Sequence, residues 1–171
     1  MQVYKIPFSD VPQLSARDKA YAAEHEGLRA FYKYPVSIEA FAQVIKDKQA
    51  TPTDRTLLVN VLKEQYAQLS VEPAVQANIK QLADAQTFTL TTAHQPSLLT
   101  GPLYYIYKII STINLAKRLR DFYPDYHFVP VFITGGEDHD FEEVQNAHLF
   151  NRTLTWENTE TGSVGLMKTD S

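Results

Sequence analysis

The spacing of apolar residues divides the chain into a helical first part and a second part that contains strands. In residues 37–46 and 53–69, apolar side chains recur three and four positions apart, which is the period of an amphipathic helix, whereas residues 18–31 are polar with scattered apolar positions. Pro35, Pro52 and Pro73 separate these stretches. The predicted helices cover residues 18–31, 37–46, 53–69 and 75–83. We predict that residues 1–85 form a helical N-terminal region that serves packing or forms one wall of a substrate cleft.

After residue 85 the pattern changes to strand, helix and strand. Phe88, Leu90 and Ala93 stand among threonines, and residues 126–134 are an apolar, β-branched run of strand length. Between them, residues 102–120 show helical periodicity and carry positive charge in the last turn, where the helix dipole favours it. Because the connections are short, we predict a βαβ unit with two parallel strands. Residues 86–171 are therefore expected to hold the first part of an α/β core and, over residues 147–156, the start of an inserted β segment.

Each predicted strand ends in a polar turn. Residues 94–101 follow the first strand and residues 135–143 follow the second. The carboxyl ends of parallel strands share one edge of a sheet, and this is the edge where open α/β sheets bind ligands. The helix that begins near Pro102 also directs unpaired N–H groups of its first turn at that edge, which favours an anion. We predict a nucleotide phosphate at the first turn and a hollow shared by both turns.

The residues of the first turn also have purely structural interpretations. His94 and Gln95 could only cap the strand end, although the strand–turn–helix context favours contact with a ligand. Thr100 and Gly101 suit a helix cap, a role that is compatible with anion binding at the same helix end. Lys108 could be a surface lysine whose stem lies along the helix, or it could face a phosphate or carboxylate.

The second turn is acidic and surrounds a single histidine. Glu142 and Glu143 suit the positive start of a helix, which needs no function. The segment 137–140 directly follows a Gly-Gly turn and is less easily explained in this way. A carboxylate or histidine there could bind an ammonium group or take the proton of an attacking amine. Magnesium held by a carboxylate and phosphates is also chemically reasonable, whereas the residues do not indicate a dedicated zinc site.

Composition sets only broad limits. The 171 residues suit one domain, and the content of 44% hydrophobic and 21% charged residues is ordinary for a globular protein. A net charge of −4 argues against binding to nucleic acid or a membrane surface by bulk electrostatics. The sequence contains no cysteine, which excludes disulfides, thiolate metal ligands and a thiol nucleophile within it. It shows neither a signal peptide nor a spanning run, so we expect a cytoplasmic protein.

The two turns also carry a family resemblance. The stretch Thr92-Ala-His-Gln-Pro-Ser-Leu-Leu-Thr-Gly-Pro-Leu-Tyr104, with Lys108 and then Gly136-Glu-Asp-His-Asp-Phe-Glu-Glu-Val144, resembles the amino-terminal part of the cysteine-adding enzyme of bacillithiol biosynthesis, a cysteine ligase. The match is dense over residues 87–146. Many members have a Gly-Gln-Gln-Pro turn where this chain has Ala93-His-Gln-Pro96. The histidine makes the turn more similar to the His-containing signature of class I aminoacyl-tRNA synthetases.

The resemblance implies a fold and a reaction. The fold would be a Rossmann-like α/β core, similar to class I synthetases and nucleotidyltransferases, preceded by the helical region. Because family members are several times longer, we expect this chain to be a truncated, amino-terminal piece that is inactive alone. The reaction would join cysteine to glucosaminyl-malate by an amide bond, with a nucleotide (ATP is expected) and a possible role for magnesium. The complete protein would be a homodimer through a coiled-coil part, with small-molecule substrates only.

These expectations assign roles to specific residues. The expected catalytic residues are Asp138, His139 and Asp140. The expected substrate- or nucleotide-binding residues are His94, Gln95, Thr100, Gly101, Tyr104, Lys108, Gly136 and Glu137, and no residue is expected to hold a metal by itself. Two other classes stay open: a different enzyme of the nucleotidyltransferase superfamily, and a non-catalytic nucleotide-binding or scaffold domain.

Overall fold

A computed structural model describes residues 2–169, and the chain forms two compact units. The first unit is Met1–Pro52 and the second is Thr53–Ser171. The predicted helical region 1–85 is thus divided between them, because its last two helices pack on the sheet of the second unit. Among the described residues, no helix is long and apolar enough to cross a membrane.

The first unit consists of short helices. They are η1 (Phe8–Asp10), α1 (Ala16–Ala22), η2 (Glu26–Phe31) and α2 (Phe41–Gln49). A capping box between Ser15 and Asp18 starts α1. The continuous helix predicted for residues 18–31 is interrupted, because Glu24 takes a positive φ of 50° between α1 and η2. The predicted cap Ser37 does accept from the Ala40 N–H at 3.2 Å, but α2 itself begins only at Phe41.

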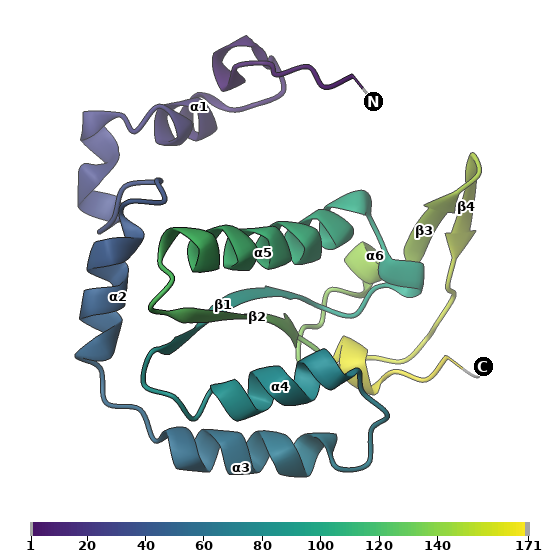
Figure 1. Ribbon diagram of the computed structural model, residues 1–171. Coiled ribbons are helices and arrows are strands. Elements are labelled where there is room, and N and C mark those ends of the chain that lie inside the picture. Colours follow the sequence, from purple (N-terminus) through teal and green to yellow (C-terminus); the bar gives the residue numbers. More distant parts are fainter. Residues whose placement is uncertain (1, 170–171) are drawn as a thin grey trace. The chain divides into compact units, whose positions relative to one another are not determined.

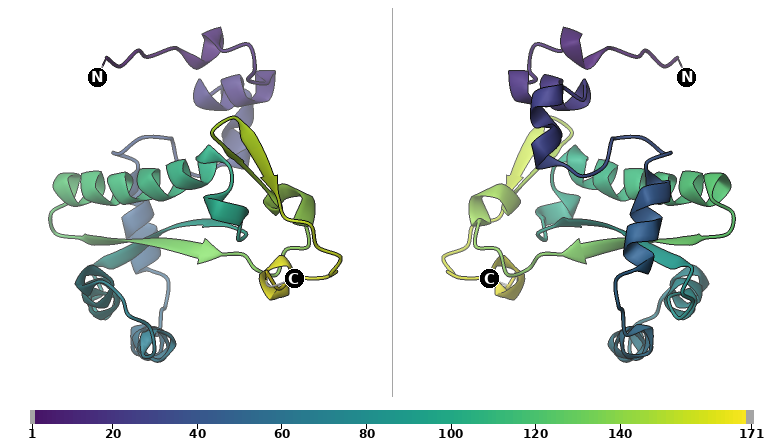
Figure 2. Two further views of the ribbon diagram at one scale, coloured as in Figure 1. Left: turned by 90° about the vertical axis from the view of Figure 1, so that its right-hand side faces the viewer. Right: turned by 90° about the vertical axis from the view of Figure 1, so that its left-hand side faces the viewer.

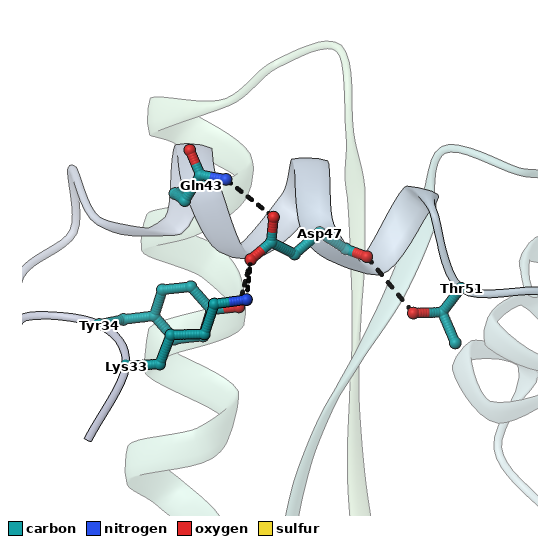
Figure 3. Close-up of polar contacts among 5 residues, drawn as sticks. All are labelled: Lys33, Tyr34, Gln43, Asp47 and Thr51. Carbon is teal, nitrogen blue, oxygen red and sulfur yellow. Dashed lines mark hydrogen bonds and ion pairs between the residues drawn. The ribbon is translucent and has the colours of Figure 1, made fainter. Parts of the chain in front are cut away.

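A carboxylate on α2 ties the preceding segment to that helix (Figure 3). Asp47 accepts from Lys33 Nζ, from Tyr34 Oη at 2.7 Å and from Gln43 Nε2 at 2.8 Å. The Lys33 ammonium, followed by the Tyr34 and Gln43 donors, lowers the pKa of Asp47 to about 2. The first unit has few buried residues, and this network is one of the contacts that connect its segments.

The second unit is built around two parallel strands. β1 (Thr87–His94) pairs with β2 (His127–Thr134), with Thr87 opposite His127 and His94 opposite Thr134. The crossover between them is α5 (Leu103–Phe122). Figures 1 and 2 show α5 on one face of this sheet, and α3 (Arg55–Tyr66) with α4 (Pro73–Gln81) on the other. The predicted βαβ unit is confirmed.

The alternation of side chains along β2 gives each helix layer its core. Val129 and Val131 pack with residues of α3 and the end of α4 on one face. On the opposite face, Phe132 contacts the Tyr105 ring of α5, with ring centroids 5.1 Å apart. Successive residues of a strand point to opposite faces, so the run of apolar residues in β2 serves both layers.

Arg55, at the start of α3, forms hydrogen bonds with the backbone that leads from α4 into β1. Its guanidinium donates to the carbonyls of Leu82 at 3.0 Å and Thr87 at 2.9 Å, with a longer contact of 3.4 Å to Ala85. The acceptors lie just after α4 and at the first residue of β1. A planar guanidinium with five donors can satisfy several carbonyls at once. One side chain therefore joins α3, α4 and β1.

The segment after β2 returns to the edge of the sheet. It contains α6 (Phe141–Val144) and an antiparallel hairpin of β3 (Asn146–Leu149) and β4 (Arg152–Thr155). The two residues between these strands have positive φ, as a two-residue hairpin turn requires. Trp156 packs edge-on against Phe141, with ring centroids 5.1 Å apart. The chain then forms η4 (Val164–Leu166), beside the carboxyl end of β2 in Figure 1.

Candidate active site

The two polar turns lie next to each other at the carboxyl edge of the sheet. The register places His94 opposite Thr134, and the Gly135 N–H donates to the His94 carbonyl at 3.0 Å. Gln95 Nε2 donates to Glu143 Oε2 at 2.7 Å, which joins the first turn to the acidic one. The structure therefore brings together the two groups of residues that the sequence analysis placed at one edge.

His94 is held by both of its ring nitrogens. The side chain is 8% exposed; Nδ1 lies 2.9 Å from the Gln95 carbonyl and Nε2 lies 2.8 Å from Tyr104 Oη. A carbonyl can only accept, so Nδ1 carries the proton, and in a neutral imidazole Nε2 accepts the Tyr104 hydroxyl proton. The imidazole thus orients Tyr104, and a ligand that bonded to His94 would have to displace one of these partners.

Lys108 belongs to the same cluster. Its Nζ donates to the Ala93 carbonyl at 3.3 Å and lies 5.4 Å from the centroid of the Tyr104 ring. The side chain is exposed, and an ammonium has three donors. Lys108 therefore places a positive charge at the end of β1, with capacity left for an anion.

The turn before α5 differs in detail from the prediction. Helix α5 begins at Leu103 with Pro102 as its N-cap, one residue later than expected, and no side chain caps it. The N–H groups of Thr100 and Gly101 donate inside the turn, to Ser97 at 3.3 Å and Leu98 at 2.8 Å. These two residues therefore shape the turn and do not offer their N–H groups to an anion. A predicted phosphate would rely on the first-turn N–H groups of α5 itself.

Gly101 has a conformation that other residues strongly disfavour. Its φ is 56° with ψ −145°, and an added Cβ would lie 2.6 Å from Cβ of Ser97. The preceding residues Leu99 and Thr100 also have positive φ, of 48° and 70°. The backbone reverses sharply here, and this reversal sets where α5 starts relative to the sheet edge.

The acidic turn is exposed and lies close to the first turn. Glu137, Asp138, His139 and Asp140 are all exposed. Asp138 Oδ1 accepts from the Asp140 N–H at 3.2 Å, which leaves its other carboxylate oxygen without such a bond. A Cβ on Gly135 would be 3.7 Å from Glu137 Oε1 and 3.9 Å from the Gln95 backbone nitrogen. The Glu137 carboxylate is therefore near the junction of the two turns.

Sequence reasoning missed four residues that contribute to this edge. Tyr105 packs against His94 with ring centroids 5.4 Å apart, and Glu143 anchors Gln95. Val164 and Gly165 donate backbone N–H groups to the carbonyls of Asp138 and Gly136, both at 2.8 Å. The position of Tyr105 within the helical pattern could have indicated its contact with the strand end. No pattern in the sequence indicates that residues 163–167 fold back onto the acidic turn.

The remaining histidines have structural partners or lie away from this edge. His25 Nδ1 accepts from the Gly27 N–H at 3.1 Å, and His148 Nδ1 lies 3.0 Å from Thr153 Oγ1 across the hairpin. His127 is at the opposite end of β2, where burial, and then the Arg120 charge, lower its pKa. Within residues 2–169, no three histidine or acidic side chains are grouped so that they could hold a metal ion.

One sizeable depression in the second unit lies elsewhere. It has a volume of about 610 Å³ and is lined by residues of α3, α4 and their connection, such as Tyr66, Val71 and Gln76. None of the predicted site residues lines it. The shared hollow expected between the two turns stays a prediction.

Comparisons with known proteins identify the family. The family model for "Bacillithiol biosynthesis BshC, N-terminal Rossmann-like domain" matches residues 1–171. Proteins named "Putative cysteine ligase BshC" are similar: that of Flavobacterium psychrophilum is 42% identical over 88% of this chain and 29% of its own length. That of Cytophaga hutchinsonii is 40% identical over 98% of the chain and 32% of its own length.

A more distant relative gives the same result. The protein of that name from Bacillus thuringiensis is 32% identical over 80% of this chain and 26% of its own length. The chain thus spans about a third or less of the length of the curated relatives it matches. The Rossmann-like class predicted from the sequence is confirmed. The chain belongs to the BshC family of bacillithiol biosynthesis and corresponds to its N-terminal Rossmann-like domain.

Proposed function

We propose that this chain forms the nucleotide- and amine-binding core of a ligase that adds cysteine to glucosaminyl-malate, in the last step of bacillithiol biosynthesis. Its family and the name of its relatives support a cysteine ligase. The observation that carries the proposal is the junction of the two turns, where the Gln95–Glu143 hydrogen bond and the Gly135–His94 backbone bond join the acidic turn to the end of β1. Lys108 lies at this same end, bonded to the Ala93 carbonyl.

The chemistry of the proposed reaction needs both kinds of residue. A free carboxylate does not form an amide in water unless it is activated, so an oxygen of the cysteine carboxylate would first attack a phosphorus atom of ATP. This forms a C–O–P linkage and releases pyrophosphate or ADP, depending on which phosphorus is attacked. The amine nitrogen of glucosaminyl-malate would then attack the carbonyl carbon. The C–N bond forms and the C–O bond to the activating AMP or phosphate breaks. The nitrogen, which starts as an ammonium group, loses one proton before the attack and a second one, to water, as the amide forms.

The residues at this edge suit the two halves of that reaction. Lys108 and the first-turn N–H groups of α5 would hold phosphate oxygens, with Tyr104 oriented beside them by His94. Glu137 would hold the ammonium group, and Asp138 or His139 would accept the proton that this group loses before the attack. If magnesium takes part, one or two of these carboxylates would hold it together with phosphate oxygens, and it would neutralise phosphate charge.

The test measures amide product in the complete gene product, supplied with cysteine, glucosaminyl-malate and ATP, by mass spectrometry. Asp138→Asn should lower kcat by about 10²- to 10⁴-fold, which is the usual contribution of a general base. Glu142→Gln is the matched control, because Glu142 is an exposed acid of α6 outside the proposed set, and it should retain wild-type turnover.

His94→Ala tests the other half of the site. It removes the acceptor of the Tyr104 hydroxyl and should raise the KM for ATP more than that for the amine. Unchanged kcat in Asp138→Asn, together with unchanged turnover and an unchanged KM for ATP in His94→Ala, would refute the assignment. Activation of cysteine by ATP is expected with or without glucosaminyl-malate. Activated cysteine that is passed to another acceptor and never to glucosaminyl-malate would instead favour a different enzyme of the nucleotidyltransferase superfamily.

A further inference from the structure

The segment that contains η4 folds back onto the acidic turn. Val164 N–H donates to the Asp138 carbonyl and Gly165 N–H donates to the Gly136 carbonyl, both at 2.8 Å. Val164 is 5% exposed, so its side chain is buried although the surrounding segment is largely exposed. The two bonds and the buried valine hold residues 164–165 against the turn.

The contact between the two backbones allows only glycine on the η4 side. A Cβ added to Gly165 would lie 2.8 Å from the Cα of Gly136 and 2.9 Å from its carbonyl oxygen. Real Cβ atoms essentially never come so close, and the obstructing atoms are backbone that cannot rotate away. A Cβ on Gly136 would itself lie 3.3 Å from the Cα of Gly165, so the two glycines face each other at close range.

This contact fixes the part of the turn that carries the proposed chemistry. The carbonyls of Gly136 and Asp138 are the acceptors, and they flank Glu137. Asp138 also accepts from the Asp140 N–H, which connects the fixed backbone to the carboxylate. Without residues 164–165 these two carbonyls would lose their partners at the segment that has to hold an amine.

We propose that Gly165 is a positioning residue of the ligase site: with Val164, it holds the backbone of Gly136–Asp138 so that the Glu137 and Asp138 carboxylates face the amine substrate. The inference rests on the proposed function. It assigns a role in the amine half-reaction to a segment distant in sequence from both turns. It assigns no role to that segment in binding the nucleotide.

The experiment compares Gly165→Ala with wild type in the complete gene product. We expect kcat/KM for the amine to fall by about tenfold to a hundredfold, the cost of a displacement of about 1 Å at a reacting group. The affinity for ATP, measured by calorimetry, should stay at the wild-type value, and the acidic limb of the pH profile of kcat/KM should move. Leu166→Ala is the matched control, because this neighbour is 84% exposed, and it should retain wild-type values.

A second variant guards against a folding defect. Val164→Ala keeps both backbone donors but removes the buried side chain, and it should give a smaller change of the same kind. Hydrogen exchange reports the contact directly: the amides of residues 164 and 165 should be protected in wild type and exchange faster in both variants. Equal loss of ATP binding and amine turnover in Val164→Ala would indicate general unfolding and overturn the positioning role.

The two proposals fail in different ways. If the wild-type protein forms no amide from these substrates, the proposed function falls, whatever the exchange experiment shows. If the wild type is active and Gly165→Ala has the same kcat/KM and pH profile, only the positioning role is overturned. Unprotected amides at residues 164 and 165 in the wild type would also overturn it.

Discussion

Replacement of Arg55 should destabilise the second unit more than its partly exposed position suggests. In Arg55→Met the stem length is kept, but the carbonyls of Leu82 and Thr87 lose donors at 3.0 and 2.9 Å. A hydrogen bond to a charged group contributes about 1.5–3 kcal/mol, and an unpaired carbonyl adds a desolvation cost. Water can replace part of this at a half-buried site. We therefore expect a loss of about 2–4 kcal/mol in the free energy of unfolding.

The single tryptophan makes this loss measurable in the right unit. Trp156 lies in the second unit against Phe141, so its fluorescence during urea unfolding follows that unit and not the first. With a slope of about 2 kcal/mol per molar urea, the expected loss lowers the midpoint by roughly 1–2 M. The slope itself should not change if both proteins unfold in one step.

Two further variants separate the proposed cause from loss of a positive charge. Lys80→Met removes a charge from an exposed position of α4 and should change stability by less than about 0.5 kcal/mol. Arg55→Lys keeps the charge, but a single ammonium group cannot donate to all the carbonyls that the planar guanidinium reaches. This variant should therefore recover only part of the lost free energy of unfolding. The reasoning is refuted if Arg55→Met is no worse than Lys80→Met, or if Arg55→Lys is as stable as wild type.

Two other predictions concern the first unit and the turn before α5. The pKa of Asp47 is lowered from its ordinary value of 3.8 to about 2, mainly by Lys33. The ionised carboxylate therefore stabilises the first unit fully at pH values above 3.8, and this contribution is lost as the pH falls towards 2. An NMR titration of the carboxyl carbon should give that low pKa and an increase in Lys33→Met; a wild-type value near 3.8 would contradict the network. Gly101→Ala should lower the urea midpoint more than Gly162→Ala, because both glycines have positive φ but only the first would bring a Cβ to within 2.6 Å of Ser97. Equal midpoints would show that the turn adjusts.

The order of helices and strands followed from the sequence because its signals were local. Threonines and β-branched residues marked β1 and β2, and the apolar period marked α5. The division between the two units did not follow. Prolines separate α2, α3 and α4 in the same way, and only the packing of Val59 and Ile79 against β2 assigns α3 and α4 to the sheet.

For the candidate site too, the sequence predicted which segments meet but not how their atoms are arranged. A parallel pair of strands predicted which turns would meet, but not which atoms. Whether His94 is open to a ligand depends on two partners, Gln95 and Tyr104, that occupy both ring nitrogens. Whether Thr100 and Gly101 donate to an anion depends on positive φ values that bring their N–H groups back into the turn. Such local reversals of the backbone have no periodic signal.

The register of β1 against β2 connects Arg55 to the candidate site. Side chains alternate along a strand, so a slip of one residue would move His94 from the face of α5 to the opposite face and break its contact with Tyr104. Arg55 bonds to Thr87, the first residue of β1, and Gly135 bonds to His94, the last. The strand is thus fixed at both ends. The hydrogen bond from Arg55 to the first residue of β1 therefore helps to stabilise the geometry of the turn that follows the last residue, although Arg55 contacts none of the predicted site residues.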